Sequence, residues 1–192
     1  MAIRKIPRKL RFGHGDLVKS DYAPESIITL LENCVTAHLS TVIGGQPHAG
    51  KTELLKYLAK FIPAEEKVGV YEDNQEIHYR QINPHSKCVE FFVDSKITYQ
   101  DIIRAGLRHN IDWVLLSESR GPEVMELLNS LSTGAYCMTT MHLDDIRDMP
   151  DRMYSMLGNG ESPDRFINSI YKYIDLVLLV DCDRFERRHI SQ

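Results

Sequence analysis

The stretch Gly45-Gln46-Pro47-His48-Ala49-Gly50-Lys51-Thr52 fits the pattern G-x-x-x-x-G-K-[ST] of a phosphate-binding loop. Gly45 and Gly50 let backbone N–H groups approach phosphate oxygens without interference from a Cβ atom. Lys51 can bring a positive charge to the β- and γ-phosphates, and the hydroxyl of Thr52 can bind Mg²⁺. These eight residues, with Glu53 directly after them, are therefore the first candidates for nucleotide binding.

The sequence on either side of the phosphate-binding loop favours this interpretation over a glycine turn that happens to precede Lys-Thr. Residues 39–43 read as a short apolar strand, and residues 52–61 carry apolar side chains at helical spacing. The loop would therefore end at a helix N-terminus, where free amides and the helix dipole favour an anion. The loop interior is unusually bulky, and Pro47 removes one amide that could bind phosphate.

The length and composition indicate one soluble globular domain. A chain of 192 residues can bury a substantial core, and its 43% hydrophobic and 26% charged residues are typical of such proteins. The net charge of −4 gives no general attraction to nucleic acid, so we predict no direct nucleic-acid readout. A basic run near the N-terminus is a local exception, expected as a solvated arm: Arg4, Lys5, Arg8, Lys9 and Arg11.

The cysteines and the hydropathy pattern indicate the cellular compartment in which the protein is expected. Cys34, Cys88, Cys137 and Cys182 are widely spaced and form no Cys-x-x-Cys pair, which predicts buried thiols in a reducing compartment. No apolar stretch approaches the roughly 20 residues needed to cross a bilayer. No apolar signal core follows the basic N-terminus. We therefore expect a cytoplasmic protein.

Helix and strand patterns alternate after an expected arm or short strand over residues 1–20. The predicted helices are 26–38, 52–61, 98–109, 122–131, 146–157 and 163–173, and the predicted strands are 39–43, 67–71, 88–93, 113–116, 136–141 and 174–180. Near-continuous apolar strands are typical of a parallel sheet. The predicted fold class is therefore α/β, with a mostly parallel central sheet flanked by helices and with ligands beyond the carboxyl ends of the strands.

Acidic and histidine side chains follow several predicted strands. Glu118 is expected beside the phosphate-binding loop, where a carboxylate could hold Mg²⁺ through water and activate the attacking water. Glu72 and Asp73 end another strand, with Glu76 close by; a charged, solvated turn is the alternative for these three. His142 could donate a hydrogen bond to the γ-phosphate, although a lone histidine is more often structural.

Further sequence boxes follow in a specific order. They are an Ile3-Arg4-Lys5 arm, the phosphate-binding loop, Tyr71-Glu72-Asp73-Asn74-Gln75-Glu76-Ile77, Arg104-Ala105-Gly106-Leu107-Arg108, Ser117-Glu118-Ser119-Arg120-Gly121-Pro122-Glu123, Thr133-Gly134-Ala135 and Thr139-Thr140-Met141-His142. In order and spacing the chain resembles, through nearly its whole length, the secretion ATPases of type II and type IV systems. This family, also called the traffic ATPases, includes conjugation and pilus motors.

The resemblance implies a RecA-like P-loop NTPase fold that binds ATP and Mg²⁺ and hydrolyses ATP. The catalytic residues it implies are Lys51, Glu72, Glu118 and His142. The metal-binding residues it implies are Thr52, Asp73, Glu76 and Glu118. Arg120 joins the nucleotide-binding residues of the loop.

The resemblance also implies a homo-hexameric ring at the inner face of the cell membrane, acting on membrane-embedded secretion or pilus components. Residues 21–192 are expected to form the ATPase domain. The family's N-terminal domain, which contributes arginines across subunits, is expected to be absent. A monomer in solution is therefore the alternative to the ring.

Three positions depart from the family pattern, and we expect them to meet at one site. They are the loop interior 46–49, Ser117 in place of a glycine, and Ala135 in place of the first histidine of the last box. These departures motivate an alternative, a nucleotide-binding scaffold with weak or no hydrolysis. A small nucleoside or nucleotide kinase is less favoured, because such kinases place the loop after the first strand near the chain start.

Overall fold

The computed structural model describes residues 9–158, 162–183 and 187–192, and the predicted arm Ile3-Arg4-Lys5 lies outside these ranges. The described chain forms a seven-stranded sheet in the order β3-β2-β4-β5-β1-β6-β7. The strands are β1 (Thr41–Gly44), β2 (Lys67–Glu72), β3 (Lys87–Phe92), β4 (Trp113–Leu116), β5 (Tyr136–Met141), β6 (Leu176–Cys182) and β7 (Arg188–Ile190). Neighbouring strands from β3 to β6 pair in parallel, and β7 pairs antiparallel to β6.

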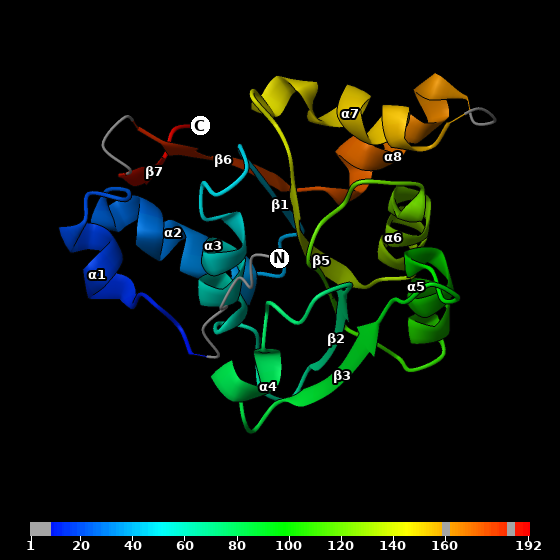
Figure 1. Cartoon of the computed structure of the whole chain (residues 1–192), viewed down its shortest axis with the longest axis horizontal. Coiled ribbons are helices and arrows are strands. Elements are labelled where there is room, and N and C mark those ends of the chain that lie inside the picture. The colour runs from blue at the N-terminus through cyan, green and yellow to red at the C-terminus, as the bar shows by residue number, and fades with distance from the viewer. Residues whose placement is uncertain (1–8, 159–161, 184–186) are drawn as a thin grey trace.

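The helices divide between the two faces of this sheet (Figure 1). One face is covered by α1 (His14–Lys19), α2 (Glu25–Thr36), α3 (Lys51–Ala59) and α4 (Tyr79–Ile82). The other is covered by α5 (Tyr99–Leu107), α6 (Glu123–Ser132), α7 (Met149–Met156) and α8 (Pro163–Tyr173). The prediction of an α/β fold with a mostly parallel sheet flanked by helices is therefore confirmed.

The central strands are buried on both faces, which explains their near-continuous apolar sequences. In β4, Trp113 and Leu115 belong to one core, while Val114 and Leu116 belong to the other. This alternation follows from the period of two along a strand. Such strands need helices on both sides, and the amphipathic helices supply them. Among the described residues, no helix has the length and apolar character needed to cross a membrane.

Residues 14–19 differ from the prediction of an arm or short strand. They form α1, and Leu17 on this helix is only 3% exposed and packs in the core of the first face. The single apolar pair Leu17 and Val18 was too short a pattern to indicate a helix. Residues 9–20 thus contribute to the core of the fold.

Three other local features were not predicted. The helix expected over residues 146–157 opens as a 3₁₀ turn, η1 (Ile146–Asp148), capped by the Asp145 side chain, before α7 begins. Helix α4 is a single turn and β7 has three residues, so neither is long enough for a periodic pattern. β7 brings Arg188 against the loop after β1, where its Nε donates to the carbonyl oxygen of His48.

Four neighbouring strands, β2, β4, β5 and β1, end at the same edge of the sheet. Their registers pair Tyr71 with Leu116, Leu116 with Thr139, and Met141 with Gly44. The segments that follow these strands therefore start side by side. This edge is where parallel α/β sheets bind ligands.

Candidate active site

The phosphate-binding loop follows β1 and has a backbone that only glycine accommodates at two positions. Gly45 has a φ of +146°, and a Cβ there would lie 2.2 Å from the carbonyl oxygen of Val180. Gly50 has a φ of +103° and is the N-cap residue of α3. His48 also adopts a left-handed φ, of +66°. The loop thus curls tightly against β6 and delivers the chain into the first turn of α3.

Lys51 is the first residue of α3 and is only 8% exposed. Its Nζ donates to the carbonyl oxygens of Gly45 at 2.8 Å and Gln46 at 2.9 Å. The same Nζ lies 3.3 Å from Nδ1 of His142. The ammonium is therefore held at the centre of the loop, beside the residue that follows β5.

Glu118 links His142 to the acidic segment after β2. His142 Nε2 lies 2.9 Å from Oε1 of Glu118, and Nη1 of Arg120 lies 3.5 Å from Oε2 of the same carboxylate. Arg120 also forms an ion pair with Asp73. Burial would raise the pKa of Asp73, but the hydrogen bond and charge of Arg120 outweigh it and hold that pKa below its usual range. A continuous polar chain therefore runs from Lys51 to Asp73.

Thr52, directly after Lys51, and Glu76 supply further oxygen atoms to the cavity wall. The hydroxyl of Thr52 donates to Oε2 of Glu76 at 3.5 Å. No group of three or more acidic, histidine or cysteine residues in the described part of the chain could hold a metal ion by itself. Hard oxygen donors beside a phosphate-binding loop fit Mg²⁺, which keeps water ligands and completes its shell with phosphate oxygens. Thr52 and Glu76 are thus positioned for such a site.

Glu72 is turned away from this arrangement. Its side chain is 1% exposed, and Oε1 accepts hydrogen bonds from the backbone N–H groups of Glu76 at 2.9 Å and Ile77 at 2.8 Å. Burial raises the pKa of Glu72 to about 7, although both hydrogen bonds act in the opposite direction. The sequence placed Glu72 among the catalytic residues. In the structure its carboxylate instead accepts hydrogen bonds from the backbone of the turn that carries Asp73 and Glu76.

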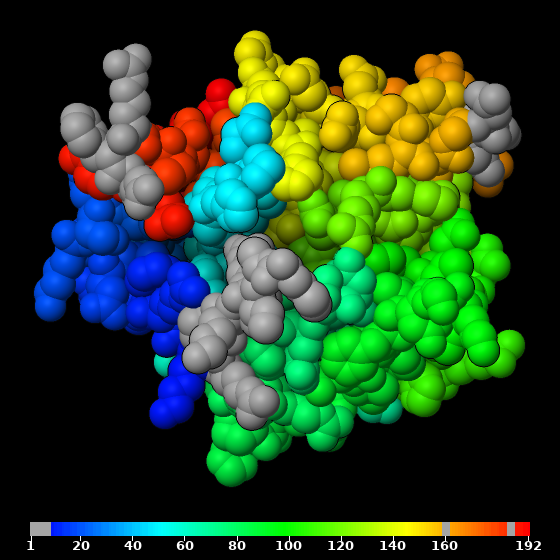
Figure 2. Space-filling view, viewed as in Figure 1, coloured from blue at the N-terminus to red at the C-terminus, as the bar shows by residue number. Residues whose placement is uncertain are grey.

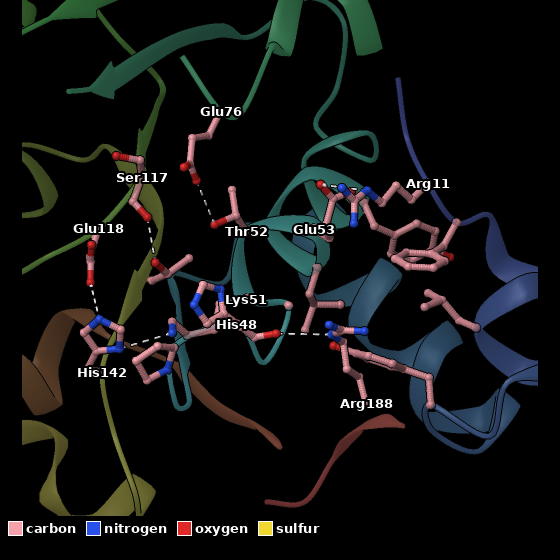
Figure 3. A pocket seen from close by; sticks show the side chains of 18 of the residues that line it. Arg11, His48, Lys51, Thr52, Glu53, Glu76, Ser117, Glu118, His142 and Arg188 are labelled. Carbon is pink, nitrogen blue, oxygen red and sulfur yellow. Dashed lines mark hydrogen bonds and ion pairs between the residues drawn. The ribbon is translucent and has the colours of Figure 1, made fainter. Parts of the chain in front are cut away.

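A cavity of about 590 Å³ lies over the loop (Figure 3). Most predicted site residues line it: Pro47, His48, Gly50, Lys51, Thr52, Glu53, Asp73, Glu76, Glu118, Arg120 and His142. Gly45, Gln46, Ala49 and Glu72 do not line it. Gly45 and Gln46 act through their carbonyl oxygens on Lys51, while the methyl group of Ala49 is buried in the core.

Other residues of the cavity wall escaped the sequence analysis. They come from the segment before α1, from α1 and the residues after it, from α3, and from the start of β7 with the residue before it: Arg11, Phe12, Leu17, Ser20, Tyr22, Leu54, Tyr57, Arg187 and Arg188. Tyr57 follows the loop by five residues on α3, so helical spacing could have indicated it. Arg188 had no such signal, because its position depends on the antiparallel return of β7.

Ala135 corrects the expectation that three departures from the family pattern meet at one site. Ser117 and two residues of the loop interior, Pro47 and His48, line the cavity, but Ala135 precedes β5 whereas His142 follows it. Six strand residues separate the two ends by roughly 20 Å. Ala135 instead lines a separate hollow of about 310 Å³ with Gly106, Leu107 and Asn110. The substitution of this histidine therefore does not touch the phosphate-binding loop.

A family model described as type II/IV secretion system protein matches residues 1–191. The chain belongs to this family. The resemblance inferred from the sequence boxes is confirmed, and the secretion-ATPase interpretation is favoured over the small-kinase alternative. A putative conjugal transfer protein of Mycobacterium tuberculosis is 28% identical over 170 residues, which are 85% of this chain and 48% of that protein.

Solved structures show that members of the secretion family share this fold. The VirB11 ATPase of the Brucella suis type IV secretion system, in complex with sulphate, superimposes with a TM-score of 0.79 at 24% identity, covering 100% of this chain and 60% of that one. The pilus retraction motor PilT with bound ADP gives a TM-score of 0.71 at 16% identity, covering 92% of this chain and 50% of that one. The chain spans about a third to a half of the length of the first curated relatives it matches.

Proposed function

We propose that this chain binds Mg²⁺–ATP at the phosphate-binding loop and hydrolyses it, as the ATPase unit of a type IV secretion, conjugation or pilus machine. The observation that supports this most is the polar chain from Lys51 through His142 to Glu118 at the carboxyl edge of the sheet. It places a buried cation, a histidine and a carboxylate around one cavity. Membership of the type II/IV secretion family supports the same function.

Each residue has a role that its position allows. The loop amides and Lys51 would bind the β- and γ-phosphates, and Thr52 with Glu76, Asp73 and Glu118 would hold Mg²⁺ directly or through water. The metal would neutralise charge that develops on the phosphates. Glu118 would orient and deprotonate the attacking water, and His142 would contact the γ-phosphate. Arg120 positions Glu118 through their 3.5 Å contact and can reach the phosphates from the cavity wall.

The base of the nucleotide would occupy the opposite end of the cavity. Figure 3 shows Glu118 and His142 on one side of Lys51, and Arg11 and Arg188 on the other. The wall between α1 and α3 carries apolar and aromatic side chains: Phe12, Leu17, Tyr22, Leu54 and Tyr57. Such surfaces suit a purine ring, whereas the polar end suits phosphates. A nucleotide laid along the cavity therefore points its γ-phosphate toward His142.

The conformational change that drives the motor would follow the release of the γ-phosphate. Release of phosphate removes a partner of Lys51 and His142, so the segment after β5 can shift relative to α3. In a homo-hexamer such shifts would pass between subunits to membrane-embedded secretion or pilus components. We place this assembly in the cytoplasm, at the inner face of the membrane.

Steady-state phosphate release tests this proposal. Wild-type protein with Mg²⁺ and ATP should show slow turnover. Lys51→Ala should abolish it by weakening nucleotide binding, and Glu118→Gln should lower it by about 10²–10⁴-fold while binding persists. Lys60→Ala and Glu65→Gln, two exposed positions outside the cavity, are matched controls that should leave the rate unchanged. Equal rates for wild type and both site variants would refute the assignment.

A nucleotide-binding scaffold without hydrolysis is the second candidate. It is favoured by the state of Glu118, because both carboxylate oxygens already contact cations or a histidine. The carboxylate must therefore give up one of these contacts before it can bind the attacking water. In this case the wild type would bind ATP, but its turnover would not exceed that of Glu118→Gln.

A further inference from the structure

Arg188 is a cation at the wall of the cavity that the proposed mechanism does not use. It begins β7, the antiparallel strand at the edge of the sheet, and its side chain is exposed. Its Nε donates to the carbonyl oxygen of His48 at 3.2 Å. A Cβ placed on Gly50 would lie 2.9 Å from Cδ of Arg188. The last strand of the chain therefore rests its arginine directly on the phosphate-binding loop.

The guanidinium of Arg188 has no carboxylate ion-pair partner among the described residues. Its neighbours on the cavity wall differ in this respect: Arg187 pairs with Asp183, Arg120 with Asp73, and Arg11 lies 3.8 Å from Glu53. The single bond from Nε to a neutral carbonyl leaves the remaining N–H donors for another acceptor. An anion in the cavity would be such an acceptor, and Arg is suited to binding phosphate through two N–H groups.

The position of Arg188 along the cavity indicates which phosphates it meets. Figure 3 shows it across the loop from His142 and Glu118, where the proposed function puts the γ-phosphate. It lies on the side of the aromatic wall, where Tyr22 is also within reach of its charge. Figure 2 agrees, since the loop segment in cyan lies between the red C-terminal strand and the yellow segment after β5. Arg188 thus lies on the opposite side of the loop from His142 and Glu118, toward the apolar and aromatic end of the cavity.

Resting on the proposed function, we propose that Arg188 is a nucleotide-binding residue supplied by the chain itself, which contacts the phosphates next to the sugar. It would add affinity for ADP and ATP alike, because both carry these phosphates. It would not sense the γ-phosphate or take part in the cleavage step. The C-terminal strand would then be clamped onto the loop whenever nucleotide is bound.

Calorimetric titration of purified full chain tests this assignment, with ADP and a non-hydrolysable ATP analogue as probes. Arg188→Ala should weaken both by a similar factor, about ten-fold, which corresponds to the loss of one charge-assisted contact. Arg165→Ala is a charge-matched control: this exposed arginine lies on α8, outside the cavity. It should leave both dissociation constants within about two-fold of wild type, an allowance for long-range charge effects.

Two further variants separate phosphate contact from simple support of the loop. Arg188→Lys keeps the positive charge but loses the planar guanidinium with its paired N–H donors. Arg188→Gln loses the charge but keeps an N–H donor for the His48 carbonyl. Phosphate contact predicts that Lys binds ADP more tightly than Gln. Equal affinities for these two variants would mean that Arg188 only braces the loop, which would overturn the inference.

The outcomes also distinguish this inference from the proposed function. If wild-type protein binds neither nucleotide, the proposed function itself fails. If wild type binds both, and Arg188→Ala binds both as tightly as Arg165→Ala does, the function stands and the inference fails. A loss confined to the ATP analogue would place Arg188 at the γ-phosphate and overturn the assignment to the sugar-proximal phosphates.

Discussion

At the scale of the residue, the loop depends on the absence of a side chain at Gly45. Its φ of +146° is unfavourable for any residue with a Cβ, and the carbonyl oxygen of Val180 occupies the space that a Cβ would need. Because that oxygen belongs to the backbone of β6, it cannot rotate away. The first glycine of the loop is therefore required by the neighbouring strand, whatever ligand the loop binds.

Gly45→Ala should lower the free energy of unfolding by about 3 kcal/mol, the sum of left-handed strain and overpacking. Urea denaturation of the chain checks this. Gly134→Ala is the matched control: Gly134 has a φ of +101°, but no atom lies within 4 Å of the point that its Cβ would occupy, so only the strain of about 1 kcal/mol should appear. Equal losses for the two variants would contradict a steric role for Val180.

At the scale of the element, the turn after β2 is organised by one buried carboxylate. Oε1 of Glu72 accepts two backbone hydrogen bonds, from Glu76 and Ile77, and so shapes the segment that presents Asp73 and Glu76 to the cavity. Burial raises the pKa of Glu72 to about 7 from an ordinary 4.5. The charged form is therefore the less stable one in the folded protein.

This shift makes the fold sensitive to pH in a defined direction. The folded state binds more protons than the unfolded state between pH 4.5 and 7, so stabilisation present below pH 4.5 is lost as pH rises to about 7. From pH 5 to pH 8, the free energy of unfolding of the wild type should decrease by about 2–3 kcal/mol more than that of Glu72→Gln. Urea denaturation at the two pH values measures this difference.

Glutamine can still accept both backbone hydrogen bonds at position 72, so the variant tests charge and leaves the turn intact. Glu65→Gln, at an exposed position, should keep the wild-type pH profile. A Glu72→Gln profile that matches wild type would show that this carboxylate does not titrate in the stated range.

The same elements show what the sequence could predict. Glu118 and His142 were predicted because parallel strands end at one edge, so residues after β4 and β5 must lie near the loop after β1. The distinction between Glu72 and Asp73 could not be predicted, because it depends on which carboxylate turns toward the backbone of residue 77. Ala135 was misplaced because sequence boxes group residues that a strand holds apart.

At the scale of the whole molecule, assembly is the property that the proposed motor function requires. The described chain presents a few large apolar side chains to solvent, including Leu30 on α2 at 54% and Phe92 at the end of β3 at 44%. The curated relatives are two to three times longer than the matched region. We therefore predict assembly for this chain by itself.

The mass of the particle in solution should increase to six copies when a non-hydrolysable ATP analogue and Mg²⁺ are added. The reason is that a ligand stabilises the state that binds it more tightly, and the proposed motor binds ATP most tightly as the assembled ring. Analytical ultracentrifugation with and without the analogue measures this. Lys51→Ala should not respond to the analogue. A wild-type mass that stays at one copy at saturating analogue would contradict assembly by this chain alone.

The pairing of β7 has a mechanical consequence. The N–H of Ile190 donates to the carbonyl of Tyr22 at 2.9 Å, and Arg188 donates to the carbonyl of His48. β7 is therefore hydrogen-bonded both to the cavity wall and to the phosphate-binding loop. A load applied at the carboxyl end would open the antiparallel β6–β7 ladder one bond at a time, as in a zipper, and would carry Arg188 away with the strand. The affinity of the chain for nucleotide would then decrease under tension.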